Sequence, residues 1–243
     1  MQNLVIDCGN TLTKWAVFEN DIVVNEGKLS SDSPASLVNI LQTLRTPENT
    51  IISSVIENCD ELTSFLKSSK HSIQFSHTTP IPVKNRYKTR QTLGLDRLAG
   101  VVGAAKQFPH ENCLVVDIGT CIKFDFVTHE GEYLGGNISP GLNMRFAALN
   151  IYTDKLPLLS YQPVEDIFGK STREAIITGV VQGMTEEIKG TIALFSAKFG
   201  KINIIITGGD ASLFENRLNI PIFADPNLVL NGLNAILEYN LPK

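Results

Sequence analysis

The feature that most constrains the fold is an internal repeat of a strand followed by a turn. Residues 114–121 read Leu-Val-Val-Asp-Ile-Gly-Thr-Cys, and residues 4–11 read Leu-Val-Ile-Asp-Cys-Gly-Asn-Thr. In each copy an apolar strand ends in Asp-x-Gly, a second strand follows, and a glycine-containing turn leads onward. Self-similarity of this kind is the signature of repeated structural units. The sequence therefore predicts two related lobes.

The pattern around the two copies is typical of a mixed α/β protein, because short β-rich runs alternate with helical periodicity. Helices are predicted at 34–44, 61–69, 93–108, 172–199, 212–218 and 228–239. We expect an α/β fold of two duplicated lobes, with mixed sheets flanked by helices and an N-terminal lobe at 1–112 and a C-terminal lobe at 113–243. The terminal helix either stays with the C-terminal lobe or packs back on the N-terminal one.

Composition restricts the function classes. The 243 residues are 43% hydrophobic and 19% charged with a net charge of −4, which excludes a disordered chain and offers no basic surface for nucleic acid or anionic membrane. Apolar runs such as 204–206 are too short to span a bilayer, and residues 1–7 lack the features of a signal peptide. We expect a cytoplasmic protein with small-molecule or protein partners. Its four cysteines, which form no Cys-x-x-Cys pair, are predicted to be reduced: Cys8, Cys59, Cys113 and Cys121.

An Asp-x-Gly turn at the end of a buried strand suits phosphate binding. Glycine lets backbone N–H groups approach phosphate oxygens, while the carboxylate holds a cation or water beside them. A lone Asp-x-Gly is more simply a tight turn capped by its aspartate. Two copies, together with a third glycine-rich turn at 207–210, favour nucleotide binding instead. The residues of the first turn predicted to bind ATP are Asp7, Cys8, Gly9, Asn10, Thr11, Leu12, Thr13 and Lys14.

Two other nucleotide motifs fit less well. Residues 168–171 resemble the end of a Walker A loop, but Val164 stands where its first glycine belongs. Ser171 and Glu174 instead form the pattern of a capping box at a helix start. No Gly-x-Gly-x-x-Gly follows the first strand, so a dinucleotide-binding Rossmann unit is not favoured.

Four segments together resemble type III pantothenate kinases in order and spacing. They are Asp7-x-Gly9-Asn10-Thr11, Gly94-Leu95-Asp96-Arg97, Asp117-x-Gly119-Thr120 and Gly135-Gly136-x-Ile138-x-Pro140-Gly141. The resemblance covers nearly the whole chain. It implies the superfamily of acetate kinase, sugar kinases, Hsp70 and actin, whose two ribonuclease H-like lobes close on ATP. The implied activity is ATP-dependent phosphorylation of pantothenate to 4′-phosphopantothenate, the opening step of coenzyme A biosynthesis.

The segment at 94–97 is expected to bind substrate and to carry the catalytic base. Asp96 is predicted in the first turn of a helix, where it could accept the proton of the attacking hydroxyl. Arg97 is expected to hold a carboxylate or phosphate with its guanidinium. Gly94 and Leu95 complete this substrate-binding segment.

The resemblance implies further site residues and ligands. Tyr87 and Thr172 match positions that contact pantothenate, and Thr120 matches an ATP contact. Asp117 matches the ligand of a monovalent cation, potassium or ammonium, and Asp7 is the candidate ligand of Mg²⁺. The family also implies a homodimer whose interface completes the pantothenate site.

One segment departs from the family pattern. The second turn usually continues Ala-x-Thr, whereas this chain has Cys121-Ile122-Lys123, so that a cation replaces a neutral hydroxyl. This change bears on metal and phosphate contacts at that turn. Gly179 and Gly183, four residues apart in the long predicted helix, favour close packing within the chain over a contact between dimer subunits.

Two alternatives remain at this point. One is a different small-molecule kinase of the same superfamily, which the segment at 94–97 and the short chain disfavour. The other is a non-catalytic regulator, since some relatives were first described as accessory factors in transcription. Retention of both Asp7 and Asp96 favours an enzyme, and the acidic chain disfavours direct DNA binding.

Overall fold

The protein is described by a computed structural model that covers residues 2–9, 11–31, 39, 47–54, 69–164 and 166–242. The chain divides into two compact units, and each is described by itself. The first unit comprises Met1–Pro109, Gly131–Tyr133 and Asn227–Lys243, and the second comprises His110–Glu130 and Leu134–Pro226. Asn10, Cys59 and the helices expected at 34–44 and 61–69, apart from Asn39 and Ser69, lie outside the described residues.

The first unit contains a mixed sheet with the order β3-β2-β1-β4-β5. Strand β1 pairs antiparallel with β2 and parallel with β4, so it lies in the centre of the sheet. Its apolar residues Leu4, Val5 and Ile6 are fully buried, as expected for a strand covered on both faces. The strands are β1 (Gln2–Cys8), β2 (Leu12–Glu19), β3 (Ile22–Ser30), β4 (Asn49–Ser54) and β5 (His71–Gln74).

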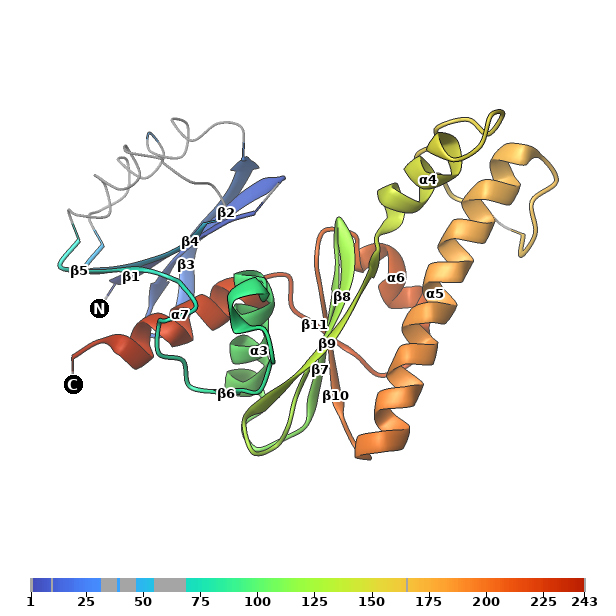
Figure 1. Ribbon diagram of the computed structural model, residues 1–243. Coiled ribbons are helices and arrows are strands. Elements are labelled where there is room, and N and C mark those ends of the chain that lie inside the picture. Colours follow the sequence, from blue (N-terminus) through green and yellow to red (C-terminus); the bar gives the residue numbers. More distant parts are fainter. Residues whose placement is uncertain are drawn as a thin grey trace. The chain divides into compact units, whose positions relative to one another are not determined.

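Two helices of the first unit, α3 (Leu95–Gln107) and α7 (Leu228–Asn240), pack closely against each other (Figure 1). Helix α7 also contacts β1, where the amide of Asn3 donates a hydrogen bond to Asn234 over 2.9 Å. The terminal helix therefore lies with the first unit, whereas a boundary at residue 112 would group it with the second lobe. A short strand, β6 (Lys84–Asn85), and a 3₁₀ helix, η1 (Arg90–Thr92), precede α3.

Gly232 allows this close approach of α7 to α3. A Cβ atom built at Gly232 would lie 1.8 Å from the carbonyl oxygen of Ala99 and 2.9 Å from the Gly103 nitrogen. Both of these atoms belong to the backbone of α3, so a side chain at position 232 would force the two helices apart.

We expect Gly232→Ala to destabilise the protein by about 2–4 kcal/mol, because overpacking against backbone cannot be relieved by a rotamer change. Gly190→Ala is the matched control, since no other described part of the structure comes within 4 Å of the Cβ position at this exposed helix residue. That control should be neutral or stabilising by up to about 1 kcal/mol. Urea unfolding of both variants measures the difference, and equal midpoints would contradict the packing argument.

The second unit is built on a sheet in which β11, β10, β7, β8 and β9 are neighbours in that order. Strand β7 pairs antiparallel with β8 and parallel with β10. The first two residues of β9, which belong to the first unit, pair with β6. The strands are β7 (Cys113–Ile118), β8 (Cys121–Val127), β9 (Glu132–Pro140), β10 (Asn203–Thr207) and β11 (Phe223–Ala224), and the helices are α4 (Leu142–Ile151), α5 (Thr172–Phe199) and α6 (Ala211–Leu218).

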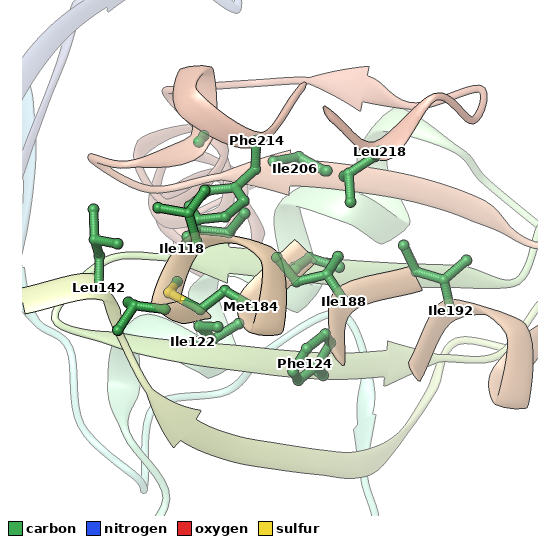
Figure 2. Packing of buried hydrophobic residues seen from close by; sticks show 14 of the residues in the cluster. Ile118, Ile122, Phe124, Leu142, Met184, Ile188, Ile192, Ile206, Phe214 and Leu218 are labelled. Carbon is green, nitrogen blue, oxygen red and sulfur yellow. The ribbon is translucent and has the colours of Figure 1, made fainter. Parts of the chain in front are cut away.

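The core of the second unit lies between this sheet and its helices (Figure 2). Helix α5 contributes a row of apolar residues at helical spacing, which includes Met184, Ile188 and Ile192. These side chains lie over Ile122 and Phe124 of β8 in Figure 2. A stripe with this spacing is what a helix needs in order to cover one face of a sheet.

The predicted duplication is confirmed by the strand order. The succession β3-β2-β1-β4 in the first unit corresponds to β9-β8-β7-β10 in the second. In both units an antiparallel hairpin carries the Asp-x-Gly turn, and a parallel strand follows on the other side. Both units thus have the predicted α/β architecture of mixed sheets with helices. Among the residues that the structure describes, no helix is long and apolar enough to cross a membrane.

Candidate functional site

The first Asp-x-Gly turn is held by hydrogen bonds from its own hairpin and from the end of β3. The Gly9 N–H donates to the Leu12 carbonyl over 3.1 Å, and the Ser31 N–H donates to the Thr11 carbonyl over 3.1 Å. The Ser31 hydroxyl donates to the Gly9 carbonyl over 2.7 Å. Asp7 lies one position before the end of β1 and is partly exposed. Hydrogen bonds within the first unit therefore hold the described residues on both sides of this turn.

The residues expected to bind ATP at this turn do not all face outward. Thr11 and Leu12 are exposed, and Lys14 is partly exposed. By contrast, Cys8 is 5% exposed and Thr13 is 4% exposed, with the Thr13 hydroxyl 3.3 Å from that of Ser31. Thr13 lies inside β2, which begins at Leu12. Cys8 and Thr13 are buried beneath the turn, so the exposed residues are the ones that a ligand could reach.

Asp96 occupies the predicted place at the start of α3. Gly94 is the N-cap of this helix and has no side chain that could cap it. Asp96 lies in the first helical turn and is the acidic residue there. Acidic side chains are commonly found in the first turn of a helix, because they interact favourably with the positive end of the helix dipole. Asp96 is partly exposed, which leaves the carboxylate within reach of a ligand.

Arg97, Tyr87 and Tyr133 form a stack beside the start of α3. The guanidinium carbon of Arg97 lies 5.6 Å from the centre of the Tyr87 ring, a cation–π distance. Tyr87 stacks in turn on Tyr133, with ring centres 6.1 Å apart and planes within 6°. Arg97 is only 6% exposed and Tyr133 is fully buried. The stack therefore fixes both predicted substrate-binding residues, Tyr87 and Arg97, in one place.

Sequence reasoning missed Tyr133, which lies at the start of β9 and whose only signal was its position after the glycine turn of the second repeat. The neighbouring Glu132 also holds the loop that carries Tyr87. Arg86 donates a hydrogen bond to Glu132 over 2.5 Å, which lowers the pKa of the Glu132 carboxyl. The Tyr87 N–H donates to Asn85 over 2.9 Å.

In the second unit, the Asp-x-Gly turn packs against the glycine-rich turn at 207–210. Thr207 is the parallel partner of Asp117, and the Asp210 N–H donates to the Ile118 carbonyl over 2.9 Å. Gly208 has φ of 103°, and a Cβ built there would lie 2.3 Å from the Ile118 carbonyl oxygen and 2.6 Å from Asp117 Oδ1. Only glycine fits this conformation and this contact. Burial raises the pKa of the Asp210 carboxyl at the same turn.

Asp117 is paired with Lys123. Strands β7 and β8 place the two residues opposite each other, and Lys123 Nζ lies 2.7 Å from Asp117 Oδ2. The resemblance implies potassium or ammonium at Asp117, but the side chains present do not fit a free cation there. The lysine ammonium already contacts the carboxylate oxygen that such an ion would need as a ligand.

The fit is better for Mg²⁺ at Asp7. Among the described residues, no group of three or more His, Cys, Asp or Glu side chains is arranged to hold a metal. Mg²⁺ in phosphoryl-transfer enzymes is commonly bound by one or two carboxylates together with substrate phosphates. A single carboxylate at the end of β1 is consistent with that mode, whereas a site made only of protein ligands is not.

Thr172 begins helix α5 at the rim of an open groove between α4 and α5. The groove has a volume of about 690 Å³ and is lined mainly by aliphatic side chains, including Leu149, Ile176 and Val180. Ser171 is the helix N-cap and accepts a hydrogen bond from the Glu174 N–H over 3.3 Å, which confirms a helix start in place of a Walker A loop. The Glu174 carboxylate accepts from the Lys170 N–H over 2.7 Å.

The glycine pair in α5 was interpreted wrongly. Gly179 and Gly183 are exposed, and no other described part of the structure comes within 4 Å of a Cβ built at either position. Intramolecular packing therefore does not explain them, because the apolar stripe that faces the sheet uses other residues of α5.

The predicted residues thus form separate groups. In the first unit, Asp7 and Thr11 lie at one turn, and the stack of Tyr87 on Arg97 lies beside the helix start that carries Asp96. In the second unit, Asp117 contacts the turn at 207–210. The exposed Thr120 lies in the hairpin turn between β7 and β8, and its carbonyl accepts a hydrogen bond from the Gly141 N–H over 3.1 Å.

Duplicated units of this topology, each with an Asp-x-Gly hairpin, are a fold that also occurs in solved structures of low sequence identity. Solved structures support the fold. A conserved putative Baf family transcriptional activator from Campylobacter jejuni superposes with a TM-score of 0.64 at 22% identity, over 98% of both chains. A putative 2-dehydro-3-deoxygalactonokinase from Sinorhizobium meliloti gives a TM-score of 0.57 at 14% identity, over 99% of this chain and 100% of that chain.

Sequence comparison narrows this fold to one family. The sequence model of the type III pantothenate kinase family matches residues 3–194. A type III pantothenate kinase of Phocaeicola vulgatus is 44% identical over 240 residues, 98% of each chain. Another from Christiangramia forsetii is 41% identical over 239 residues, again 98% of each chain. The chain belongs to the type III pantothenate kinase family.

Proposed function

We propose that the protein is a pantothenate kinase, which transfers the γ-phosphoryl group of ATP to the primary hydroxyl of pantothenate. The product is 4′-phosphopantothenate, the first intermediate of coenzyme A biosynthesis. The observation that carries the proposal is family membership over nearly the full length, together with an intact Asp96 at a helix start. Among the alternatives, a non-catalytic regulator would have no need of that carboxylate.

In the proposed reaction Asp96 accepts the proton of the pantothenate hydroxyl as the oxygen attacks phosphorus. A carboxylate in this position can serve as the general base. Arg97 and Tyr87 position the anionic substrate, because the buried guanidinium can form strong charge-assisted hydrogen bonds with a carboxylate. Gly94 and Leu95 are proposed to contact the substrate beside the start of α3.

The ATP phosphates are proposed to bind the exposed residues of the first turn. In the second unit, the Thr120 hydroxyl is proposed separately as an ATP contact. The Thr11 backbone N–H and the ammonium of Lys14 supply a donor and positive charge. When bound, Mg²⁺ neutralises developing charge on the transferred phosphoryl group, and Asp7 is the residue that would hold it. No monovalent cation is proposed at Asp117, because the Lys123 ammonium already contacts that carboxylate.

A homodimer is proposed because the α4–α5 region of the second unit exposes large apolar residues. At the end of α4, Ile151 is 71% exposed and Tyr152 is 85% exposed. Exposed apolar clusters mark interaction surfaces. The open glycine positions at 179 and 183 and the groove beside Thr172 lie along helix α5. A cytoplasmic location is proposed because the proposed reaction consumes ATP.

The direct test is ATP turnover by purified protein with a panel of hydroxyl acceptors, each assayed with and without potassium. The proposal expects a signal with pantothenate that well exceeds those with glycerol, glucose, N-acetylmannosamine and acetate. Phosphorus NMR of the product identifies a phosphomonoester on the primary hydroxyl. A preference for a sugar would instead support another kinase of the same superfamily.

Alkylation of Cys121 is expected to report nucleotide binding at the second turn. This partly exposed thiol lies next to Thr120, so a bound ATP analogue should slow its reaction with iodoacetamide by about threefold or more. Cys113 is the internal control, because burial raises its pKa to about 11 and keeps it unreactive. Peptide mass spectrometry measures both rates, and an unchanged rate at Cys121 would remove Thr120 from the proposed ATP site.

A further inference from the structure

The carboxylate of Asp117 already has a positive charge beside it. Lys123 Nζ lies 2.7 Å from Asp117 Oδ2, and the two side chains are only 19% and 20% exposed. The other carboxylate oxygen, Oδ1, faces Gly208, where even a Cβ atom would lie 2.6 Å away. One oxygen is thus bound to an ammonium group and the other lies against a closely packed turn.

On the basis of the proposed kinase function, we propose that the ammonium group of Lys123 replaces the monovalent cation at Asp117. Phosphoryl transfer by this protein would then require neither potassium nor free ammonium. Lys123 acts as a positioning residue, since it supplies a fixed charge next to the second phosphate turn and does not react itself.

The electrostatic argument rests on the similarity of the two cations. A lysine ammonium and a free ammonium ion carry the same charge and donate the same kind of hydrogen bond to a carboxylate. A tethered group has a high effective concentration, whereas a free ion must bind from solution. A further cation at Oδ2 would meet the like charge of Lys123 at short range in a partly buried place, where repulsion is only weakly screened.

The hairpin geometry makes this arrangement unstrained. Asp117 and Lys123 are direct partners across β7 and β8, so their side chains emerge on the same face of the sheet. The first hairpin repeats the combination, since Asp7 and Lys14 are direct partners across β1 and β2. A lysine opposite the turn aspartate is therefore compatible with both copies of the duplicated hairpin.

The test compares wild-type protein, Lys123→Thr and Lys123→Arg in pantothenate phosphorylation across a potassium titration. Choline chloride keeps the ionic strength constant, so screening does not change. Threonine restores the neutral hydroxyl of the family pattern, and arginine keeps the charge. Lys201→Thr is the matched control. This substitution removes the same positive charge from the same unit, but at a side chain that is 90% exposed.

We expect potassium to change wild-type and Lys201→Thr activity by less than about twofold. Lys123→Thr should lose about tenfold or more in kcat/KM without potassium and recover most of it when potassium or ammonium is added. Lys123→Arg should remain independent of potassium. Thallium-205 NMR gives a readout separate from activity: Tl⁺, a potassium substitute, should bind Lys123→Thr and not the wild-type protein.

Three results would overturn the proposal, and they can be told apart. Strong potassium activation of the wild-type enzyme, or Tl⁺ binding at Asp117 in that protein, would refute it while leaving the kinase function intact. Loss of activity in Lys123→Thr that no cation restores would assign Lys123 to direct phosphate binding instead. Absence of pantothenate phosphorylation under every cation condition would refute the proposed function, and this inference with it.

Discussion

Replacement of Asp96 by asparagine is expected to lower kcat by about 10² or more, while the fold and ATP binding persist. The amide has nearly the same shape as the carboxylate but cannot accept the hydroxyl proton. Asp96 lies in the first turn of α3 and is partly exposed, so the substitution creates no cavity. Loss of the favourable charge–dipole interaction should cost only about 0.3–1 kcal/mol of stability.

Steady-state kinetics and thermal unfolding on one preparation measure both effects of Asp96→Asn. Asp154→Asn is the matched control, because it makes the same isosteric change at an exposed position of the second unit. The control should keep near wild-type kcat. If Asp96→Asn reduces activity by less than about threefold, Asp96 is not the general base.

Much of the fold could be predicted because it follows from local patterns. The strand that ends at each Asp-x-Gly turn is a continuous apolar run, and helix α5 was predicted with the bounds found, since Ser171 caps it and Gly200 ends it. The repeated hairpin that the sequence predicted is present in both units. These features depend on residues that are close together in sequence, where periodicity and capping preferences act directly.

What the sequence could not supply are contacts between distant segments. The stack of Tyr87 on Tyr133 joins residues from a loop and from a strand of the second repeat, and no local pattern marks it. The contact of α7 with α3 depends on Gly232, an ordinary glycine in a helical pattern.

The second Asp-x-Gly turn combines a feature that the sequence showed with a contact that only the structure shows. Lys123 was visible in the sequence as a departure from the family pattern, yet its role depended on a distance. Strand register places it opposite Asp117, and the side chains then meet at 2.7 Å. Likewise, Gly179 and Gly183 are exposed because no other described segment packs against them. The spacing of residues along a helix does not by itself determine which of its faces is covered.

Replacement of Asp7 by alanine is expected to lower kcat by about 10² or more through weaker neutralisation of charge in the transition state. The fold should survive, because the turn is held by hydrogen bonds of Gly9, Thr11 and Ser31 that do not use the Asp7 side chain. Strand β1 keeps its buried apolar residues and its pairing on both sides. The expected loss is therefore in catalysis.

If Asp7 only caps its own turn, its replacement should affect stability more than catalysis. Stability would fall by about 1 kcal/mol with kcat largely kept. Ser31→Ala calibrates this case, since it removes the 2.7 Å hydrogen bond to Gly9 and measures what loosening of the turn alone does to stability and rate. Thermal unfolding and kinetics of both variants separate the two roles. An Asp7→Ala protein that melts earlier, as Ser31→Ala should, yet retains near wild-type kcat would refute Mg²⁺ binding by Asp7 at the first turn, because a carboxylate that holds the charge-neutralising Mg²⁺ cannot be removed without slowing the reaction.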